Sequence, residues 1–171
     1  MDPYLPDIMQ SVVAKVSTIL QSTFSFAAFF DKGNQSQVSK SIHDNKDHFP
    51  LVWLKMPFTV KRGNHGIFGK VRTDLILAMP TENTYTQQQR DTLVYKPYLL
   101  PLYEALIKQI AIEKMFSFSG PESLAHDQVI MPYWGGGAIN GTDNMNLFEK
   151  NIDAIGIIGL EINIRNKNNC P

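Results

Sequence analysis

Two segments of the chain carry the spacing of an amphipathic helix. Between residues 5 and 20, apolar side chains recur every three or four positions, and Pro6 stands where a helix can begin. A second long helix is expected to begin near Pro97, with a wide apolar stripe over residues 99–110. A helix with so wide a stripe packs between a sheet and another layer. A short helix is also expected over residues 35–44.

Shorter apolar runs predict the first strands of a sheet. Residues 24–30 and 51–56 are compact apolar runs, and the turn-forming residues 31–34 are expected to end the first of them. Residues 58–62 and 67–71 flank a short glycine-containing segment, which predicts a β-hairpin.

A long alternating strand follows this hairpin. Apolar and polar residues alternate over residues 71–79, so one face of the strand is expected to be buried. Pro80 is expected to end the strand. The polar residues 81–90 connect it to the second helix, with a helical turn expected from Thr86.

The last strand has the clearest pattern. One set of alternate residues is apolar and is expected to face the core: Ile158, Leu160, Ile162 and Ile164. The residues between them, from Glu161 onward, are polar and are expected to face away from it. Residues 154–157 are apolar on both faces, and Gly156 or Gly159 is a candidate for a β-bulge.

Two less regular runs precede this strand. Residues 112–118 and 129–134 are apolar enough to predict strands, and a glycine-rich loop is expected from residue 135 to about residue 151. The polar residues 166–171 are expected to form a flexible C-terminal tail.

The order of these elements is helix, strands, helix, strands. It predicts an α+β fold, in which an N-terminal helix and a second long helix pack on one side of a mostly antiparallel sheet. A chain of 171 residues can bury a sizeable core, and no repeat or linker divides it. Residues 1–171 are therefore expected to form a single domain.

Composition and charge narrow the functional classes. Hydrophobic residues make up 43% of the chain, and its 16 Lys and Arg residues balance its 16 Asp and Glu residues. Such a chain has no overall positive charge to bind nucleic acid or an anionic membrane, so neither partner is expected. The single cysteine, Cys170, cannot form an intramolecular disulfide, and no signal-peptide pattern is present. We expect the protein to be made in a reducing cytoplasm.

The glycine run at residues 135–137 is the first candidate for a chemical site. It follows a predicted strand, as a phosphate-binding loop does. Such a loop also needs a helix directly after it, and usually a Lys-Ser or Lys-Thr pair. Neither follows here. The sequence therefore predicts a loop without a phosphate site.

The histidines and carboxylates form no recognisable catalytic or metal-binding pattern. His43 and His48 lie close together, but no cysteine pair or further short-spaced ligand accompanies them. We therefore expect no enzymatic activity, no cofactor and no metal. The alternative is a small ligand-binding or enzymatic domain, with His126, Asp127 and Asp143 as its candidate residues.

Two segments are candidates for contacts with another subunit or protein. The first is the predicted hairpin, with Lys61, Arg62, His65, Phe68 and Lys70. The second is the aromatic and glycine-rich segment of Trp134, Gly135, Gly136 and Gly137. Aromatic side chains are enriched at protein interfaces. A solvated hairpin and a well-filled core are the alternatives for these features.

The succession of elements resembles the tail-terminator, tail-completion and head–tail joining proteins of long-tailed bacteriophages. An N-terminal amphipathic helix leads to the strand at Phe49-Pro50-Leu51-Val52-Trp53-Leu54. The hairpin, the alternating strand of residues 70–79, the helix near Pro97 and the strand of residues 153–164 follow. The resemblance covers most of the chain. Residues 24–44 and 135–151 are long for a minimal member of this group.

This resemblance implies a structural virion protein of the tail or neck, made in the cytoplasm of a bacterial host. Members of the group form rings, typically hexamers, between the tail tube and the neck. The expected partners are further copies of the chain, the tail-tube protein and the head–tail connector or neck proteins. A different neck adaptor or a tail-tube protein is an open alternative. The family brings no catalytic residues to this sequence.

Overall fold

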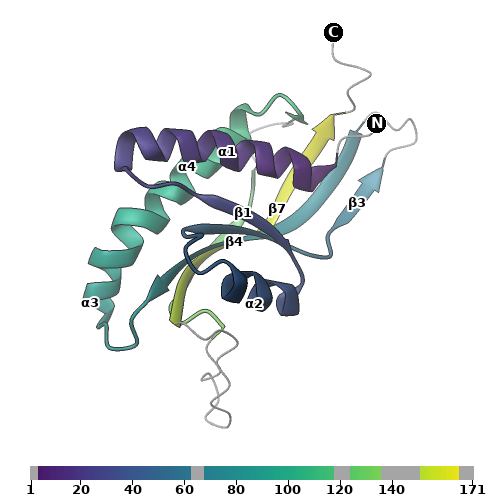
Figure 1. The fold of residues 1–171 in the computed structure, drawn as a ribbon. Coiled ribbons are helices and arrows are strands. Elements are labelled where there is room, and N and C mark those ends of the chain that lie inside the picture. Colours follow the sequence, from purple (N-terminus) through teal and green to yellow (C-terminus); the bar gives the residue numbers. More distant parts are fainter. Residues whose placement is uncertain (1–3, 63–67, 118–123, 136–150, 166–171) are drawn as a thin grey trace.

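The computed structural model describes residues 4–62, 68–117, 124–135 and 151–165. These residues form an α+β fold around a mixed, mostly antiparallel sheet, as the sequence predicts (Figure 1). The helices are α1 (Leu5–Phe24), α2 (Gln35–Asp44), α3 (Gln87–Arg90), the π-helix η1 (Asp91–Leu99) and α4 (Leu100–Ile112). The strands are β1 (Phe29–Gly33), β2 (Leu51–Lys55), β3 (Thr59–Arg62), β4 (Phe68–Thr81), β5 (Phe116–Ser117), β6 (Asp127–Met131) and β7 (Asn151–Arg165).

The two long strands β4 and β7 form the centre of the sheet. They pair antiparallel along their whole length, from Phe68 opposite Arg165 to Thr81 opposite Asn151. On the outer side of β4, β3 pairs with its first half and β2 with its second half. On the outer side of β7, β6 pairs with its first half and β5 with its end. Strand β1 extends the sheet beyond β2 and is parallel to it.

A β-bulge interrupts the pairing of β4 and β7. Ile158 and Gly159 together lie opposite Asp74, between the pairs Thr73–Leu160 and Leu75–Ile157. Gly159 has a φ of 71°, which favours glycine, and its backbone N–H donates to Asp74 Oδ1 at 2.9 Å. The prediction of a bulge at Gly159 is therefore confirmed.

The bulge reverses which residues of β7 face the helices. Leu160, Ile162 and Ile164 pack in the core under α1 and α4, as predicted, whereas Ile158 packs against the opposite face. The prediction that Ile158 faces the same way as Leu160 was wrong, because the extra residue of the bulge shifts the alternation by one position.

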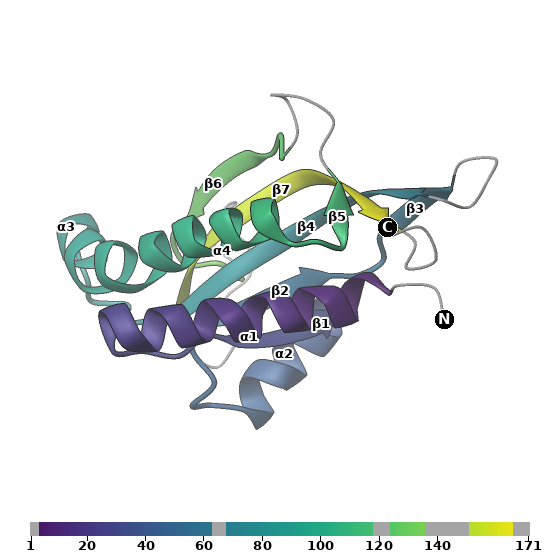
Figure 2. The ribbon, with the colours of Figure 1, turned by 90° about the horizontal axis from the view of Figure 1, so that it is seen from above.

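Both faces of the sheet are covered where β4 and β7 are most apolar. Helices α1 and α4 lie side by side on one face (Figure 2), where Val12, Val16, Leu102 and Leu106 are buried. Helix α2 covers the other face and buries Val38 and Ile42 in a cluster with Trp53. The prediction that the N-terminal helix and the second long helix pack on one side is confirmed, and α2, which was predicted at its correct position, lies on the other side.

Two boundaries in the first half of the chain differ from the prediction. The segment from residue 24 to 30 is not one strand, because α1 continues to Phe24 and β1 begins at Phe29. Residues Asp31, Lys32 and Gly33 belong to β1 and not to a turn. Their strand conformation follows from pairing with β2, in which Lys32 lies beside Leu54. Long-range pairing outweighs the local turn preference of these residues.

Two prolines lie inside elements that they were expected to bound. Pro80 belongs to β4, opposite Ile152, beyond the part of β4 that pairs with β2. Its missing N–H therefore removes no bond to a strand on that side. Pro97 lies inside the π-helix η1, which joins α3 to α4. The second helix thus begins before Pro97, and the wider turn of a π-helix gives the proline ring room.

The remaining strand predictions are confirmed in part. Among the described residues 112–117, strand β5 comprises Phe116 and Ser117, and Ile112 still belongs to α4. Strand β6 begins two residues earlier than the predicted run and ends at Met131. The predicted tail, residues 166–171, lies outside the described residues. Among the helices of the described part, none combines the length and apolar character needed to cross a membrane.

Candidate functional site: two sheet edges and a buried ion pair

A buried ion pair joins the start of η1 to the centre of the sheet. Arg90, the last residue of α3, donates through Nη1 to Asp153 Oδ1 of β7, and their side chains are 2% and 0% exposed. Arg90 also donates to Thr81 Oγ1 at 3.3 Å and to the Glu82 carbonyl at 3.2 Å. Asp153 lies on the helix face of β7 because it has the same parity as Ile155. An arginine above that face is therefore placed to neutralise it.

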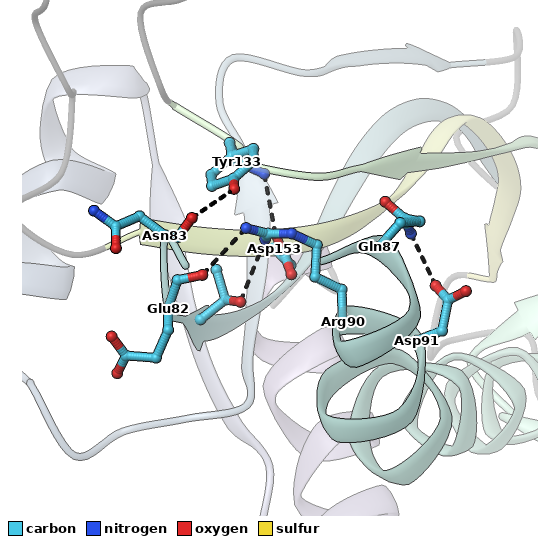
Figure 3. Close-up of polar contacts among 8 residues, drawn as sticks. Glu82, Asn83, Gln87, Arg90, Asp91, Tyr133 and Asp153 are labelled. Carbon is cyan, nitrogen blue, oxygen red and sulfur yellow. Dashed lines mark hydrogen bonds and ion pairs between the residues drawn. The ribbon is translucent and has the colours of Figure 1, made fainter. Parts of the chain in front are cut away.

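The same pair fixes the turn that follows β6. The backbone N–H of Tyr133 donates to Asp153 Oδ1 at 3.0 Å, and the Arg90 guanidinium lies 3.7 Å from the centre of the Tyr133 ring (Figure 3). The Tyr133 hydroxyl donates to the Asn83 carbonyl at 3.1 Å. Tyr133 has a φ of 54°, a conformation that needs such support. The ion pair thus ties β6 to β7 and to the connection after β4.

Tyr95 of η1 lies in the same buried region. Burial raises the pKa of its hydroxyl, and the negative charge of Asp153 adds to this increase. Within the described residues, neither Tyr95 Oη nor Asp153 Oδ2 has a hydrogen-bond partner. Tyr95 therefore remains a protonated phenol throughout the physiological pH range, and this geometry assigns it no acid–base role.

Strand β6 is an apolar edge of the sheet. Within the described residues it pairs with β7 alone, so its outer backbone groups face away from the sheet. Val129 and Ile130 are 39% and 47% exposed, and they lie on opposite faces of the strand. A strand edge with apolar side chains on both faces favours pairing with another strand.

Strand β3 is the corresponding edge beside β4, and it carries two of the predicted contact residues. All four of its residues are exposed, including Val60 at 38%. Lys61 lies opposite Lys70 of β4, while Arg62 lies on the other face of β3. Positive side chains are one means by which proteins keep an edge strand from unspecific pairing.

The outer face beside β3 is positively charged. Lys70 Nζ lies 2.6 Å from Glu161 Oε2 of β7. The pKa of the Glu161 carboxyl is lowered, first by the hydrogen bond from Lys70 and then by the charges of Lys70, Arg72 and Lys61. Of the predicted contacts, the structure thus brings Lys61 and Lys70 together on one face of the hairpin.

The other predicted contact residues are placed only in part. Phe68 begins β4, where its backbone pairs with Arg165. Trp134 is half-buried beside the cluster under α2, and Gly135 follows with a φ of 78°. The aromatic segment lies at the β6 end of β7, away from the basic hairpin. His65, Gly136 and Gly137 lie outside the described residues.

Of the candidates for ligand or metal chemistry, His126 has contacts within the fold. His126 lies between the Leu124 carbonyl, 2.6 Å from Nδ1, and the Tyr103 hydroxyl, 2.8 Å from Nε2. The carbonyl accepts only, so Nδ1 carries a proton and donates it to Leu124. Asp127 is exposed on β6, and Asp143 lies outside the described residues. No three His, Cys, Asp or Glu side chains gather around a metal position in the described part of the chain.

A small cavity lies beside α2. Its volume is about 40 Å³, and its polar lining includes Asp31, Ser41, Asn45 and His48. Asp31 already accepts a hydrogen bond from the Ser41 hydroxyl, and the His48 ring stacks on Phe29 with 4.6 Å between ring centres. The cavity has room for a few water molecules, so it does not form a substrate site.

Sequence reasoning missed the ion pair and the edge character of β6. One signal was available: Asp153 is the only charged residue between Ile152 and Leu160. A carboxylate inside a buried strand needs a partner. Nothing in the sequence identifies Arg90 as that partner. No protein-family model matches the chain, and no curated protein matches it either.

Proposed function

We propose that this protein is a ring-forming tail terminator of a long-tailed bacteriophage, which caps the tail tube and joins it to the head or neck. The observation that carries the assembly part of the proposal is the exposed apolar edge of β6, with Val129 and Ile130 on its two faces. A strand with an exposed outer edge of this kind is suited to a protein partner.

The second edge supports a ring. Strands β6 and β3 lie on opposite sides of the central β4–β7 pair. Two different surfaces on opposite sides of a subunit give heterologous contacts, which close into rings when the rotation between subunits allows it. A single self-complementary edge would instead give a dimer.

The long central strands fit a structural part of a virion. The 14 residues of β4 and the 15 residues of β7 run through the whole sheet, and both faces of their apolar half are covered. The buried ion pair and the bulge hold the two strands in one register. The specific assignment to the tail end comes from the resemblance in the order of elements and in the segment around Trp53.

Arrest of tube growth tests this proposal. The tail-tube protein encoded by the same genome is polymerised with and without the purified chain, and tube length is measured by electron microscopy. A terminator stops growth at amounts far below one copy per tube subunit. Unchanged tube lengths, together with a chain that stays monomeric by native mass spectrometry with tubes present, would contradict the proposal. A tail-tube gene directly downstream would favour a terminator over another neck protein.

A further inference from the structure

The exposed edges of β6 and β3 differ in a complementary way. The outer edge of β6 carries Val129 and Ile130, with Asp127 at the beginning of the strand. The outer edge of β3 carries Val60 between polar residues and ends with Lys61 and Arg62. One edge is apolar with a carboxylate, and the other is basic with one apolar side chain.

The topology fixes how two such edges of neighbouring copies can meet. Strands β3 and β7 run in one direction and β4 and β6 in the other, because each neighbouring pair is antiparallel. When the next copy is placed beside β6 in the same orientation, its β3 meets β6 antiparallel. In this arrangement the helix face of one sheet continues as the helix face of the next.

The faces then restrict the register. Ile130 lies opposite Ile155 and Val60 lies opposite Val71, and both of these partners pack in the core under α1 and α4. Ile130 and Val60 are therefore on the same face, so they can lie opposite each other across the contact. A shift of one residue would place them on different faces.

We propose that β6 of one copy pairs antiparallel with β3 of the next copy, with Ile130 opposite Val60. This inference rests on the proposed ring and names its subunit contact. In this register all four residues of β3 find a partner on β6, and Val129 lies opposite Lys61. The exposed β-branched side chains of Ile130 and Val60, both on the helix face, then pack against each other.

Charge complementarity supports the same register. Asp127 shares the face of Val129, and its diagonal neighbour across the contact is Lys61 of the next copy. Pairing of β6 with a second β6 is less well matched. Centred on Val129, it places the polar Gln128 opposite Ile130 and Asp127 opposite Met131. The side chains thus favour a heterologous contact over a two-fold one.

Paired cysteines test the register. In a chain with Cys170→Ser, Val60→Cys is combined with Ile130→Cys, and Lys61→Cys with Val129→Cys. Opposite pairs alternate between the hydrogen-bonded and the closer non-hydrogen-bonded kind, so one of the two combinations has the shorter Cβ separation. Mild oxidation in the presence of tail tubes is expected to give a ladder of covalent oligomers for that combination.

Matched controls separate this contact from others. Val60→Cys with Val129→Cys places the thiols on opposite faces, so a ladder is not expected. Val129→Cys alone is expected to give no covalent dimer, whereas such a dimer would establish two-fold β6 pairing centred on Val129 and overturn the inference. A covalent link from the Ile130→Cys variant to the tube protein alone would also overturn it, in favour of a different occupant.

A charge swap gives a second readout in the folded protein. Asp127→Lys and Lys61→Asp are each expected to weaken ring formation about 2- to 5-fold, the range of an exposed ion pair. The double variant is expected to regain the lost affinity. If all three charge variants assemble into rings like the original chain, and the paired cysteines give no ladder, the edge contact is overturned. The proposal that the protein forms a ring would remain valid. If the cysteine ladders form but the tubes continue to grow, the β6–β3 contact is supported and the terminator function is contradicted.

Discussion

Arg90 and Asp153, which are 63 positions apart in the sequence, form a buried ion pair. Asp153 also accepts a hydrogen bond from the backbone N–H of Tyr133, so the pair holds the turn after β6 in place. Arg90 is the last residue of α3 and directly precedes the π-helix, Asp153 lies in β7, and the Tyr133 ring covers the guanidinium. Neither charge is accessible to water, so each depends on the other.

Removal of either charge is expected to destabilise the fold strongly. Arg90→Met leaves the Asp153 carboxylate buried without its partner, which costs about 3–5 kcal/mol. Urea unfolding followed by circular dichroism measures this loss. Lys55→Met is the matched control, since Lys55 pairs with Asp74 at 3.3 Å on the surface and has a side chain that is 60% exposed. The control is expected to cost less than about 1 kcal/mol.

The double variant Arg90→Met with Asp153→Leu distinguishes a required pair from two independent contacts. An apolar replacement of both partners removes the uncompensated charge, so the double variant is expected to lose less stability than the sum of the single losses. Additive losses would mean that the two side chains stabilise the fold separately.

Loss of the hydroxyl group should change the free energy of unfolding differently at Tyr95 and at Tyr103. The buried Tyr95 hydroxyl has no partner within the described residues, so Tyr95→Phe is expected to leave stability unchanged or increase it. The Tyr103 hydroxyl binds His126 Nε2 at 2.8 Å, so Tyr103→Phe is expected to cost about 0.5–1.5 kcal/mol. Urea unfolding compares the two. A loss above about 1 kcal/mol for Tyr95→Phe would reveal a hydrogen bond to its hydroxyl.

Substitutions of Gly159 in the bulge are expected to destabilise the fold by amounts that depend on the new side chain. Its φ of 71° is accessible to asparagine but strained for a β-branched residue. A Cβ at this position would also lie 3.2 Å from the Arg72 guanidinium. Gly159→Val is therefore expected to lower the free energy of unfolding by more than Gly159→Asn, by about 1–2 kcal/mol. Equal losses in thermal unfolding would show that the backbone conformation is not the cause.

Acid should weaken the contact between α1 and the end of α4. Lys15 Nζ lies 2.6 Å from Glu113 Oε2. Burial alone would raise the pKa of Glu113, but the hydrogen bond from Lys15 and those from the backbone of Met115 and Lys114 outweigh it and lower the pKa below 4.5. A carboxyl with a lowered pKa stabilises the folded state above its unfolded pKa, and this contribution disappears as the pH falls through the folded pKa.

Glu113→Gln should remove that part of the acid dependence. The original chain is expected to lose stability between about pH 5 and the lowered pKa, and the variant to lose less over the same interval. Unfolding midpoints measured from about pH 7 to about pH 3 test this. Parallel curves for the two proteins would show that Glu113 does not titrate with the folding equilibrium.

Local patterns in the sequence predicted the helices and the long strands, because those elements have clear periods. The stripe of α1, the four-residue spacing of Val38 and Ile42, and the alternation in β4 and β7 all reflect which side faces a core. Residues 31–33 were mispredicted because their strand conformation depends on pairing with β2. A local sequence pattern carries no information about that pairing.

The candidate site was predicted less well than the fold. Lys61 and Lys70 were correctly placed on one hairpin, because adjacent strands follow each other in sequence. The partner of Asp153 lies far away in the chain, so spacing alone could not identify it. The exposed character of β6 was also missed, since an apolar run predicts burial in a core and an apolar edge equally well.

Electron microscopy of tail-tube ends tests the central claim most directly. Tubes assembled from the tail-tube protein of the same genome are incubated with the purified chain and imaged. The proposed function predicts one ring of this protein at one end of each tube, and loss of that ring with Ile130→Lys in a chain that unfolds at the original temperature. Bare tube ends in the presence of folded protein, or protein bound along the tube wall without a ring, would contradict it.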